Sequence, residues 1–322
     1  MAGKVRLFEH PDFDQIIVRT AANLGIREQF VEKDYHVTEV LRIVEGTLGD
    51  KVIFKGGTSL SKGWNLTTRF SEDIDLFIDP QRFNPPLGTR RIDRTLETLA
   101  TEVADHPALT WQKDEAIKHK GSDRSDYFSY QTQFDALPGI RSAVLLEPGI
   151  QSGDFPWEVR PITSLVADFL LEDDRHDLAD DLQPFEMTLL HFRRTFVEKL
   201  FTVDGKVTRL MANGGQIGRH ARHYADLFTL AGTPEVKNML SSDEFKEIRL
   251  DYDEKSRRFY PKFYRPPDDL SFRDSPALFP SDDLRAQLAG DYEKECSRLF
   301  SGGDYPAFDA VLARLQETRD LL

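Results

Sequence analysis

The stretch that decides the fold is residues 54–79, which read FKGGTSLSKGWNLTTRFSEDIDLFID. The residues that lead into this stretch, Lys51 to Phe54, form a short apolar run that predicts a strand. Gly56 and Gly57 then predict a turn in which the backbone can come close to a ligand. Thr58 is expected to cap a helix reaching about Trp64, which would leave a helix N-terminus open to phosphate.

The second half of this stretch carries two carboxylates in a run that favours β structure. In an extended backbone, Asp73 and Asp75 point to one face of the strand and Ile74 to the other. Paired oxygen ligands on one face suit Mg²⁺, a hard cation. A Walker A loop is disfavoured because GxxxxGK[ST] cannot be laid on GGTSLSK. An EF-hand is excluded because its remaining ligands and its glycine are missing.

These residues resemble a known family. Gly-Gly-(Ser/Thr) followed by Asp-x-Asp resembles the nucleotidyltransferase superfamily that includes DNA polymerase β. The fuller string GGTSLSK…RFSEDIDL, with Lys62 and the run from Arg69 to Glu72 in place, resembles its AbiEii/MenT toxin branch. That resemblance implies an α/β (α+β) fold: a nucleotidyltransferase-type mixed sheet with flanking helices, followed by a mainly helical C-terminal domain. It also implies the enzyme half of a bacterial toxin–antitoxin or phage-defence pair.

The remaining chain fits this organisation. Apolar spacing predicts a helical preface over residues 11–45, interrupted near Gly25. We expect a domain boundary near residue 170, with a catalytic domain over 1–170 and a mainly α-helical domain over 171–322 that contributes Lys199 and Asp226 to the site. The other expected elements are a helix over 91–105, strands over 109–112, 127–134 and 142–147, an edge strand over 160–164, and helices over 165–171, 185–201 and 218–230.

A third metal ligand is implied by the resemblance alone. Superfamily members carry an Asp or Glu on a neighbouring strand, and Glu147 ends the apolar run Ala143 to Leu146 beside Pro148-Gly149. The alternative is a glutamate that simply faces solvent at the end of a strand.

Two motifs of the second half match the family less completely. The helix ending in Glu198-Lys199 resembles its third motif, and the run from Arg219 to Leu227 resembles its fourth, with Asp226 as the last acid. His223 and Tyr224 stand about where relatives often have Arg-Asp, so the neighbouring positions are uncertain. Asp226 is expected to hold Lys199 or Arg222 in place rather than bind metal. His220 and His223 lack a third nearby ligand, which disfavours a histidine metal site.

The mechanism implied by the resemblance is nucleotidyl transfer. Asp73, Asp75 and Glu147 would bind Mg²⁺, with Mn²⁺ possible, and an NTP would be the donor. The tRNA 3′ end would be the acceptor, so that aminoacylation and translation stop. Transfer to a protein hydroxyl and a non-catalytic nucleotide-binding module are the alternatives. The phosphates would be held by Gly56, Gly57 and Thr58, with Lys62 and Lys199 supplying cations.

Regulation and partners follow from the same resemblance. A cognate antitoxin is expected, either AbiEi-like or kinase-like. Ser71 lies two residues before the first metal ligand, where a phosphate would add about −1.5 to −2 charges and repel a triphosphate. Ser71 as a plain capping residue is the equal alternative.

Composition limits the remaining possibilities. A net charge of −13 argues against a protein that coats nucleic acid non-specifically, so any RNA contact must be local. The single cysteine, Cys296, excludes an internal disulfide. Without an export signal or an apolar run long enough for a membrane helix, we expect a cytoplasmic protein. Arg257 to Arg265 interleaves cations with aromatic rings, which fits either a grip on RNA or ordinary packing.

Overall fold

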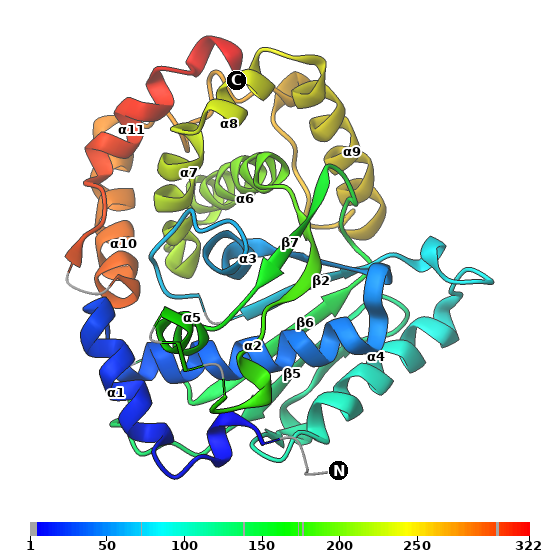
Figure 1. Ribbon diagram of the computed structural model, residues 1–322. Helices are drawn as coiled ribbons and strands as arrows, with labels where there is room; N and C mark the ends of the chain where they lie inside the picture. The colour runs from blue at the N-terminus through cyan, green and yellow to red at the C-terminus, as the bar shows by residue number, and fades with distance from the viewer. Residues whose placement is uncertain (1–4, 72, 138, 173, 176, 301–302) are drawn as a thin grey trace. The chain divides into compact units, whose positions relative to one another are not determined.

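The computed structural model describes residues 5–71, 73–137, 139–172, 174–175, 177–300 and 303–322. The chain divides into two compact units (Figure 1). The first, called the sheet unit, comprises Met1–Asn65, Phe70–Ile150 and Trp157–Leu189. The second, called the helical unit, comprises Leu66–Arg69, Gln151–Pro156 and Leu190–Leu322.

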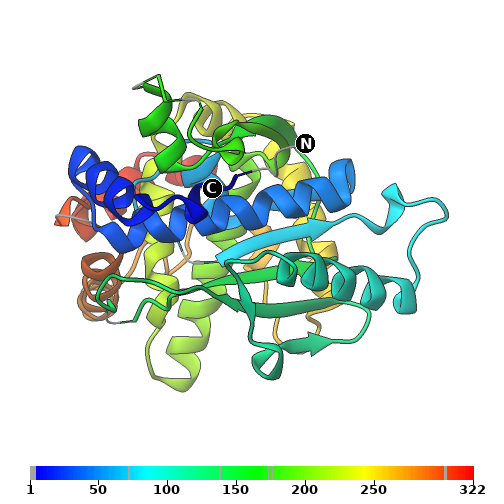
Figure 2. The same ribbon diagram turned by 60° about the horizontal axis from the view of Figure 1, so that its bottom comes forward.

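The sheet unit is built on one mixed sheet, whose described strands follow the order β3-β5-β6-β2-β1-β8-β7, with β4 paired to β5. Strands β1 and β2 are antiparallel, whereas β2 pairs with β6 and β1 pairs with β8 in parallel. In Figure 2, the cyan strand β2 lies beside the green strand β6. The strands are β1 (Val52–Lys55), β2 (Asp73–Ile78), β3 (Thr110–Trp111), β4 (Ile117–His119), β5 (Asp123–Ser129), β6 (Ala143–Gly149), β7 (Trp157–Ile162) and β8 (Phe185–Leu190).

The helical preface forms as the apolar spacing predicts. Helix α1 (Phe13–Leu24) ends where Gly25 adopts a left-handed backbone, with a φ of 65°, and donates its N–H to the carbonyl of Ala21. Helix α2 (Glu28–Leu48) follows directly. The other helices of the sheet unit are α3 (Gly56–Lys62), α4 (Thr89–Ala104) and α5 (Leu165–Glu172).

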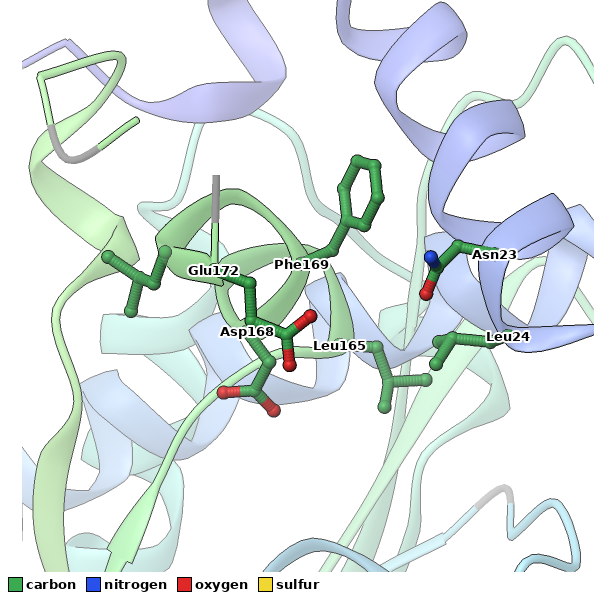
Figure 3. Close-up of a pocket in the computed structure, with 7 residues that line it drawn as sticks. Asn23, Leu24, Leu165, Asp168, Phe169 and Glu172 are labelled. Atoms are coloured by element: carbon green, nitrogen blue, oxygen red, sulfur yellow. The ribbon is translucent and has the colours of Figure 1, made fainter. Parts of the chain in front are cut away.

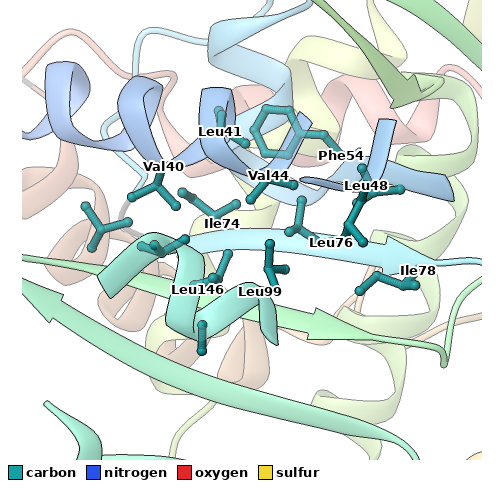
Figure 4. Close-up of a cluster of buried hydrophobic side chains, with 14 of the residues drawn as sticks. Val40, Leu41, Val44, Leu48, Phe54, Ile74, Leu76, Ile78, Leu99 and Leu146 are labelled. Carbon is teal, nitrogen blue, oxygen red and sulfur yellow. The ribbon is translucent and has the colours of Figure 1, made fainter. Parts of the chain in front are cut away.

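The main core lies between the sheet and helices α2 and α4 (Figure 4). Ile74, Leu76 and Ile78 of β2 are buried in it, together with Leu146 of β6. These residues alternate along their strands with Asp73, Asp75 and Glu147. The core therefore covers one face of β2 and β6, and the carboxylates project from the other face.

The described part of the helical unit contains α6 (Phe192–Asn213), the 3₁₀ helix η6 (Gly218–Arg222), α7 (His223–Ala231), α8 (Pro234–Leu240), α9 (Asp243–Phe259), α10 (Asp282–Leu299) and α11 (Phe308–Gln316). The expected mixed α/β architecture with a largely helical second half is thus observed. No described helix is both long and apolar enough to cross a membrane.

Two expected elements are wrong. Phe185–Leu190 is the strand β8, parallel to β1, and the helix begins only at Phe192, where the ring of His191 accepts the N–H of Arg193. A short, buried apolar run has no periodicity that separates a strand from a helix. The sheet therefore includes residues beyond the expected boundary near 170.

The second error is the strand expected over residues 127–134. Strand β5 instead spans Asp123–Ser129 and begins with charged residues. Arg124 and Asp126 are both buried and form a two-bond ion pair, at 2.5 and 2.8 Å. A pair of mutually neutralised charges can occupy interior positions that a sequence pattern assigns to a turn.

Candidate active site

The acidic face of the sheet is set by strand register. Asp73 and Asp75 alternate with the core residues of β2, and both are half-buried. Strand β6 is parallel to β2, with Glu147 directly beside Asp75. Directly paired residues of neighbouring strands project to the same face of a sheet. The three carboxylates that the sequence singles out are therefore brought to one face.

Glu147 is oriented by a neighbouring strand. Its Oε1 accepts a hydrogen bond of 2.9 Å from the Ser125 hydroxyl on β5. Nothing in the sequence identifies Ser125, because its role depends on the pairing of β5 with β6. A serine in this position restricts the glutamate rotamer without neutralising its charge.

The glycine turn packs directly against Asp75. Gly56 has a φ of 78°, and a Cβ placed there would lie 2.0 Å from Asp75 Oδ2. Only glycine adopts this backbone conformation readily while leaving room for the carboxylate. The turn and the acidic strand thus form one structural unit, as the sequence motif predicts.

Thr58 does not have the expected role of an N-cap. Helix α3 already begins at Gly56, with Lys55 as its N-cap residue, so Thr58 lies within its first turn. The Thr58 hydroxyl is buried and donates to the carbonyl of Asp73 at 2.5 Å. It therefore fixes the start of β2. The first N–H groups of α3, including those of Gly56 and Gly57, have no acceptor within the helix.

The donors fit a hard divalent cation by chemistry, since three carboxylates share one face. The side chains as described do not yet converge: no three histidine, cysteine, aspartate or glutamate residues come close enough to hold a metal ion among the described residues. The backbone register of β2 and β6 nevertheless places Glu147 directly beside Asp75.

Lys62, expected to contact phosphate, has a protein partner. Its ammonium lies 2.6 Å from Asp34 Oδ1, and its side chain is almost fully buried. The other oxygen of Asp34 accepts the N–H of Leu165 at the start of α5. Lys62 thus ties α3 to α2, and Asp34 is a residue whose role the sequence analysis did not predict.

Ser71 is largely buried, with 9% of its surface exposed. Glu72, which completes the motif, lies outside the described residues.

In the helical unit, Asp226 joins two cations. Arg69 binds it through two hydrogen bonds, from Nε to Oδ1 at 2.7 Å and from Nη2 to Oδ2 at 2.9 Å. The ammonium of Lys199 lies 2.7 Å from Asp226 Oδ2. Of the two cations expected for Asp226, Lys199 is thus in contact with it, and Arg69 is a partner that the sequence did not predict. All three side chains are buried.

The electrostatics of this cluster follow from burial and pairing. Burial by itself raises the pKa of Asp226, but Arg69 and Lys199 outweigh it and hold that pKa well below its usual range. Burial lowers the pKa of Lys199, and Asp226 opposes that change. Burial and the charge of Lys199 together lower the pKa of His223 well below its ordinary value.

His223 therefore remains a neutral ring, whose Nδ1 lies 3.1 Å from the Lys199 ammonium and can accept its proton. The same Nδ1 lies 3.6 Å from Asp226 Oδ2. A hydrogen bond and an ion pair thus fix the position of the Lys199 ammonium.

The one pocket drawn in close-up lies elsewhere (Figure 3). It has a volume of about 580 Å³, lies between α1 and α5, and contains none of the carboxylates of β2 and β6. Leu24 and Phe169 line it together with Asp168 and Glu172. Two acids among apolar side chains suit a triphosphate poorly, so we place the candidate site on the carboxylate face instead.

Comparison with known proteins identifies a family and a similar fold. The family described as "Nucleotidyl transferase AbiEii toxin, Type IV TA system" matches residues 40–314. The fold is similar to that of MenT4, a nucleotidyltransferase toxin from Mycobacterium tuberculosis H37Rv, with a TM-score of 0.56 and 14% identity over 96% of this chain and 88% of that one.

A crystal structure from H. pylori, assigned as a nucleotidyltransferase, aligns with a TM-score of 0.46 and 16% identity over 92% of this chain and 95% of the other. No curated protein matches the sequence.

Proposed function

The chain belongs to the AbiEii nucleotidyl transferase toxin family, and from that premise we propose that it transfers a nucleoside monophosphate from an NTP to the 3′ end of tRNA. The donor would be used with Mg²⁺, and the modified tRNA could no longer accept an amino acid. One observation carries the proposal: Asp73, Asp75 and Glu147 project from a single face of neighbouring strands.

In this reaction the terminal hydroxyl of the RNA attacks the α-phosphate of the NTP. A new P–O bond forms, the bond to the β-phosphate oxygen breaks, pyrophosphate leaves, and the hydroxyl proton passes to solvent. Bound Mg²⁺ would supply charge neutralisation at the α-phosphate and a more acidic hydroxyl. Asp73, Asp75 and Glu147 are the residues that would hold it.

The phosphates need cations and N–H donors. Gly56 and Gly57 offer backbone N–H groups at the start of α3, beside Asp75. Lys199 offers an ammonium already positioned by Asp226. Lys62 is a weaker candidate, because its ion pair with Asp34 would have to break or be shared.

The test uses purified protein, Mg²⁺, each α-³²P-labelled NTP in turn and total tRNA. We expect label in tRNA with at least one NTP. Asp75→Asn keeps the size of the side chain but loses a charged ligand, and should lower transfer by at least about 100-fold. Its melting temperature should stay close to that of the parent, since Asp75 is not part of the core.

Label on polypeptide but not on RNA would replace the tRNA acceptor with a protein hydroxyl. Undiminished transfer by a folded Asp75→Asn protein would refute the assignment of the site. As a further check, Lys199→Met should raise the KM for the NTP when it is assayed well below its own melting temperature. An unchanged KM in the folded variant would instead assign Lys199 to the fold.

A toxin of this family implies a cognate antitoxin. We propose that the antitoxin either covers the acidic face or modifies a hydroxyl near it, with Ser71 as the candidate. Mass spectrometry of the toxin after co-expression with the antitoxin distinguishes the two, because only modification adds the mass of a phosphate.

A further inference from the structure

Three cations gather on the surface of the helical unit. Lys206 and Arg209 lie three residues apart on α6, so they share one face of that helix. Arg219 is exposed on η6, which packs against α6. The pKa of Lys206 is lowered by partial burial and by the charges of Arg209 and Arg219, which shows that the three charges are close together.

These charges are not balanced by acids among the described residues, where none of the three has an ion-pair partner. Asp204, also on α6, is buried and accepts a hydrogen bond from Ser275. Asp291 of α10 is buried and accepts the N–H of Ile217. These two acids are therefore committed to internal partners.

The same concentration of positive charge acts on His220. Burial, followed by the charges of Lys206 and Arg219, lowers its pKa to about 4. In a chain with a net charge of −13, this cluster is a local patch of positive charge, and such a patch attracts a polyanion.

An exposed aromatic ring lies beside the cations. Phe263 is 68% exposed, and the guanidinium of Arg209 lies 5.9 Å from the centre of its ring. Phe263 belongs to the basic and aromatic segment over 257–265. The next residue, Tyr264, is only partly exposed, with its ring 6.3 Å from Phe201 and 6.1 Å from Tyr252.

Ordinary packing and RNA contact, the two interpretations of this segment, thus concern different residues. Tyr264 anchors the segment by packing, whereas Phe263 is left on the surface next to Arg209. An exposed ring at this distance from a guanidinium provides a stacking platform for an unpaired base.

We propose that Lys206, Arg209, Arg219 and Phe263, here called the basic patch, bind the RNA acceptor. The cations would contact backbone phosphates, and Phe263 would stack on a base. This inference rests on the proposed function for the choice of RNA, and it assigns RNA recognition to residues other than the three carboxylates, Lys199 and Asp226. RNA rather than an acidic protein is favoured because an exposed aromatic ring beside phosphate-binding cations suits unpaired nucleotides.

Fluorescence anisotropy with end-labelled total tRNA tests the patch directly. The triple variant K206E/R209E/R219E should bind the tRNA at least ten-fold more weakly than the parent. A matched control, K237E/K246E/K294E, makes the same change in net charge at exposed lysines of α8, α9 and α10, and should bind within about two-fold of the parent.

The salt dependence and the aromatic ring give two further readouts. Replacing the three cations by glutamine should lower the slope of log affinity against log salt by about 2 to 3, because each phosphate contact contributes about 0.7 to 0.9. Phe263→Ala should weaken binding several-fold and leave this slope unchanged.

The outcomes separate this inference from the proposed function. Asp75→Asn should bind tRNA like the parent while transferring at least about 100-fold less. Patch-dependent binding without any transfer by the parent would support the patch and reject tRNA as substrate. Unchanged binding by the glutamate triple variant, an equal loss in the control, or no tRNA binding by the parent would each overturn the inference.

Discussion

At the scale of single residues, Asp226 shows how a buried ion pair can serve a site. Two cations, Arg69 and Lys199, share one carboxylate out of contact with water. Such a cluster contributes little net stability compared with an apolar core, because each charge loses its hydration. The cluster instead fixes the position of the Lys199 ammonium, which has little freedom to move.

Removing the shared carboxylate tests this view. Asp226→Asn keeps the shape of the side chain but leaves two buried cations without a counter-charge, and should lower the free energy of unfolding by about 3 to 5 kcal/mol at pH 7. Urea unfolding followed by circular dichroism measures the change. As a control, Asp309→Asn breaks the exposed ion pair with Arg285 and should cost less than about 1 kcal/mol. Equal effects would mean that the cluster is solvated.

The stability difference between the parent and Asp226→Asn is expected to depend on pH. The pKa of Asp226 is held well below its usual range in the folded protein, so its stabilising effect is complete above about pH 4, the unfolded pKa. That effect is lost as the pH falls through the folded pKa. The difference in unfolding free energy between parent and Asp226→Asn should therefore be constant above about pH 5 and shrink below about pH 4.

At the scale of elements, the strand–turn–helix unit from β1 to α3 owes its geometry to one glycine. Gly56 combines a left-handed backbone with direct contact to the carboxylate of Asp75. A glycine turn of this kind can be recognised in a sequence. Its contact partner, 19 positions away from Gly56, depends on the antiparallel pairing of β1 with β2.

Gly56→Ala should affect both the element and the site. The unfavourable backbone conformation should cost about 1 to 2 kcal/mol, and the new methyl group should displace Asp75 and lower nucleotidyl transfer. The control is Gly46→Ala in α2, where a Cβ meets nothing within 4 Å. That substitution should instead stabilise the protein by about 0.5 to 1 kcal/mol. Full transfer by Gly56→Ala would show that the position of Asp75 is not critical.

At the scale of the whole molecule, acid sensitivity is expected from buried histidine. His36 of α2 is 2% exposed and stacks on Tyr130, with ring centres 4.1 Å apart. Its Nδ1 has no hydrogen-bond partner among the described residues. Burial, with a smaller contribution from His106, lowers the pKa of His36 from 6.5 to about 3.

Because the folded pKa lies below the unfolded one, the stability contributed by neutral His36 is present above about pH 6.5 and is lost as the pH falls towards about 3. His36→Phe keeps the stacked ring and removes the titration. Relative to this variant, the parent should lose up to about 1.4 kcal/mol of unfolding free energy per pH unit in that window. Parallel pH profiles for the two proteins would show that His36 is accessible to protons in the folded state.

The sequence by itself determined the features that depend on local pattern. The apolar spacing around Gly25 identified the first two helices, and the alternation in β2 placed Asp73 and Asp75 on one face. The glycine turn and the Asp-x-Asp pair together indicated the family. All of these features lie within one element or a short segment, where backbone geometry and side-chain period leave few alternatives.

Only the tertiary structure decided which distant residues meet. Arg69 and Asp226 are 157 positions apart, and Lys62 pairs with Asp34 across 28 positions. The run from Phe185 to Leu190 became a strand because β1 was available to pair with it. The physical reason is the same in each case. A charged side chain can form an ion pair, and a short apolar run can pack or pair, with many alternative partners in the chain. Only the folded arrangement of the whole chain determines which of these partners is in reach.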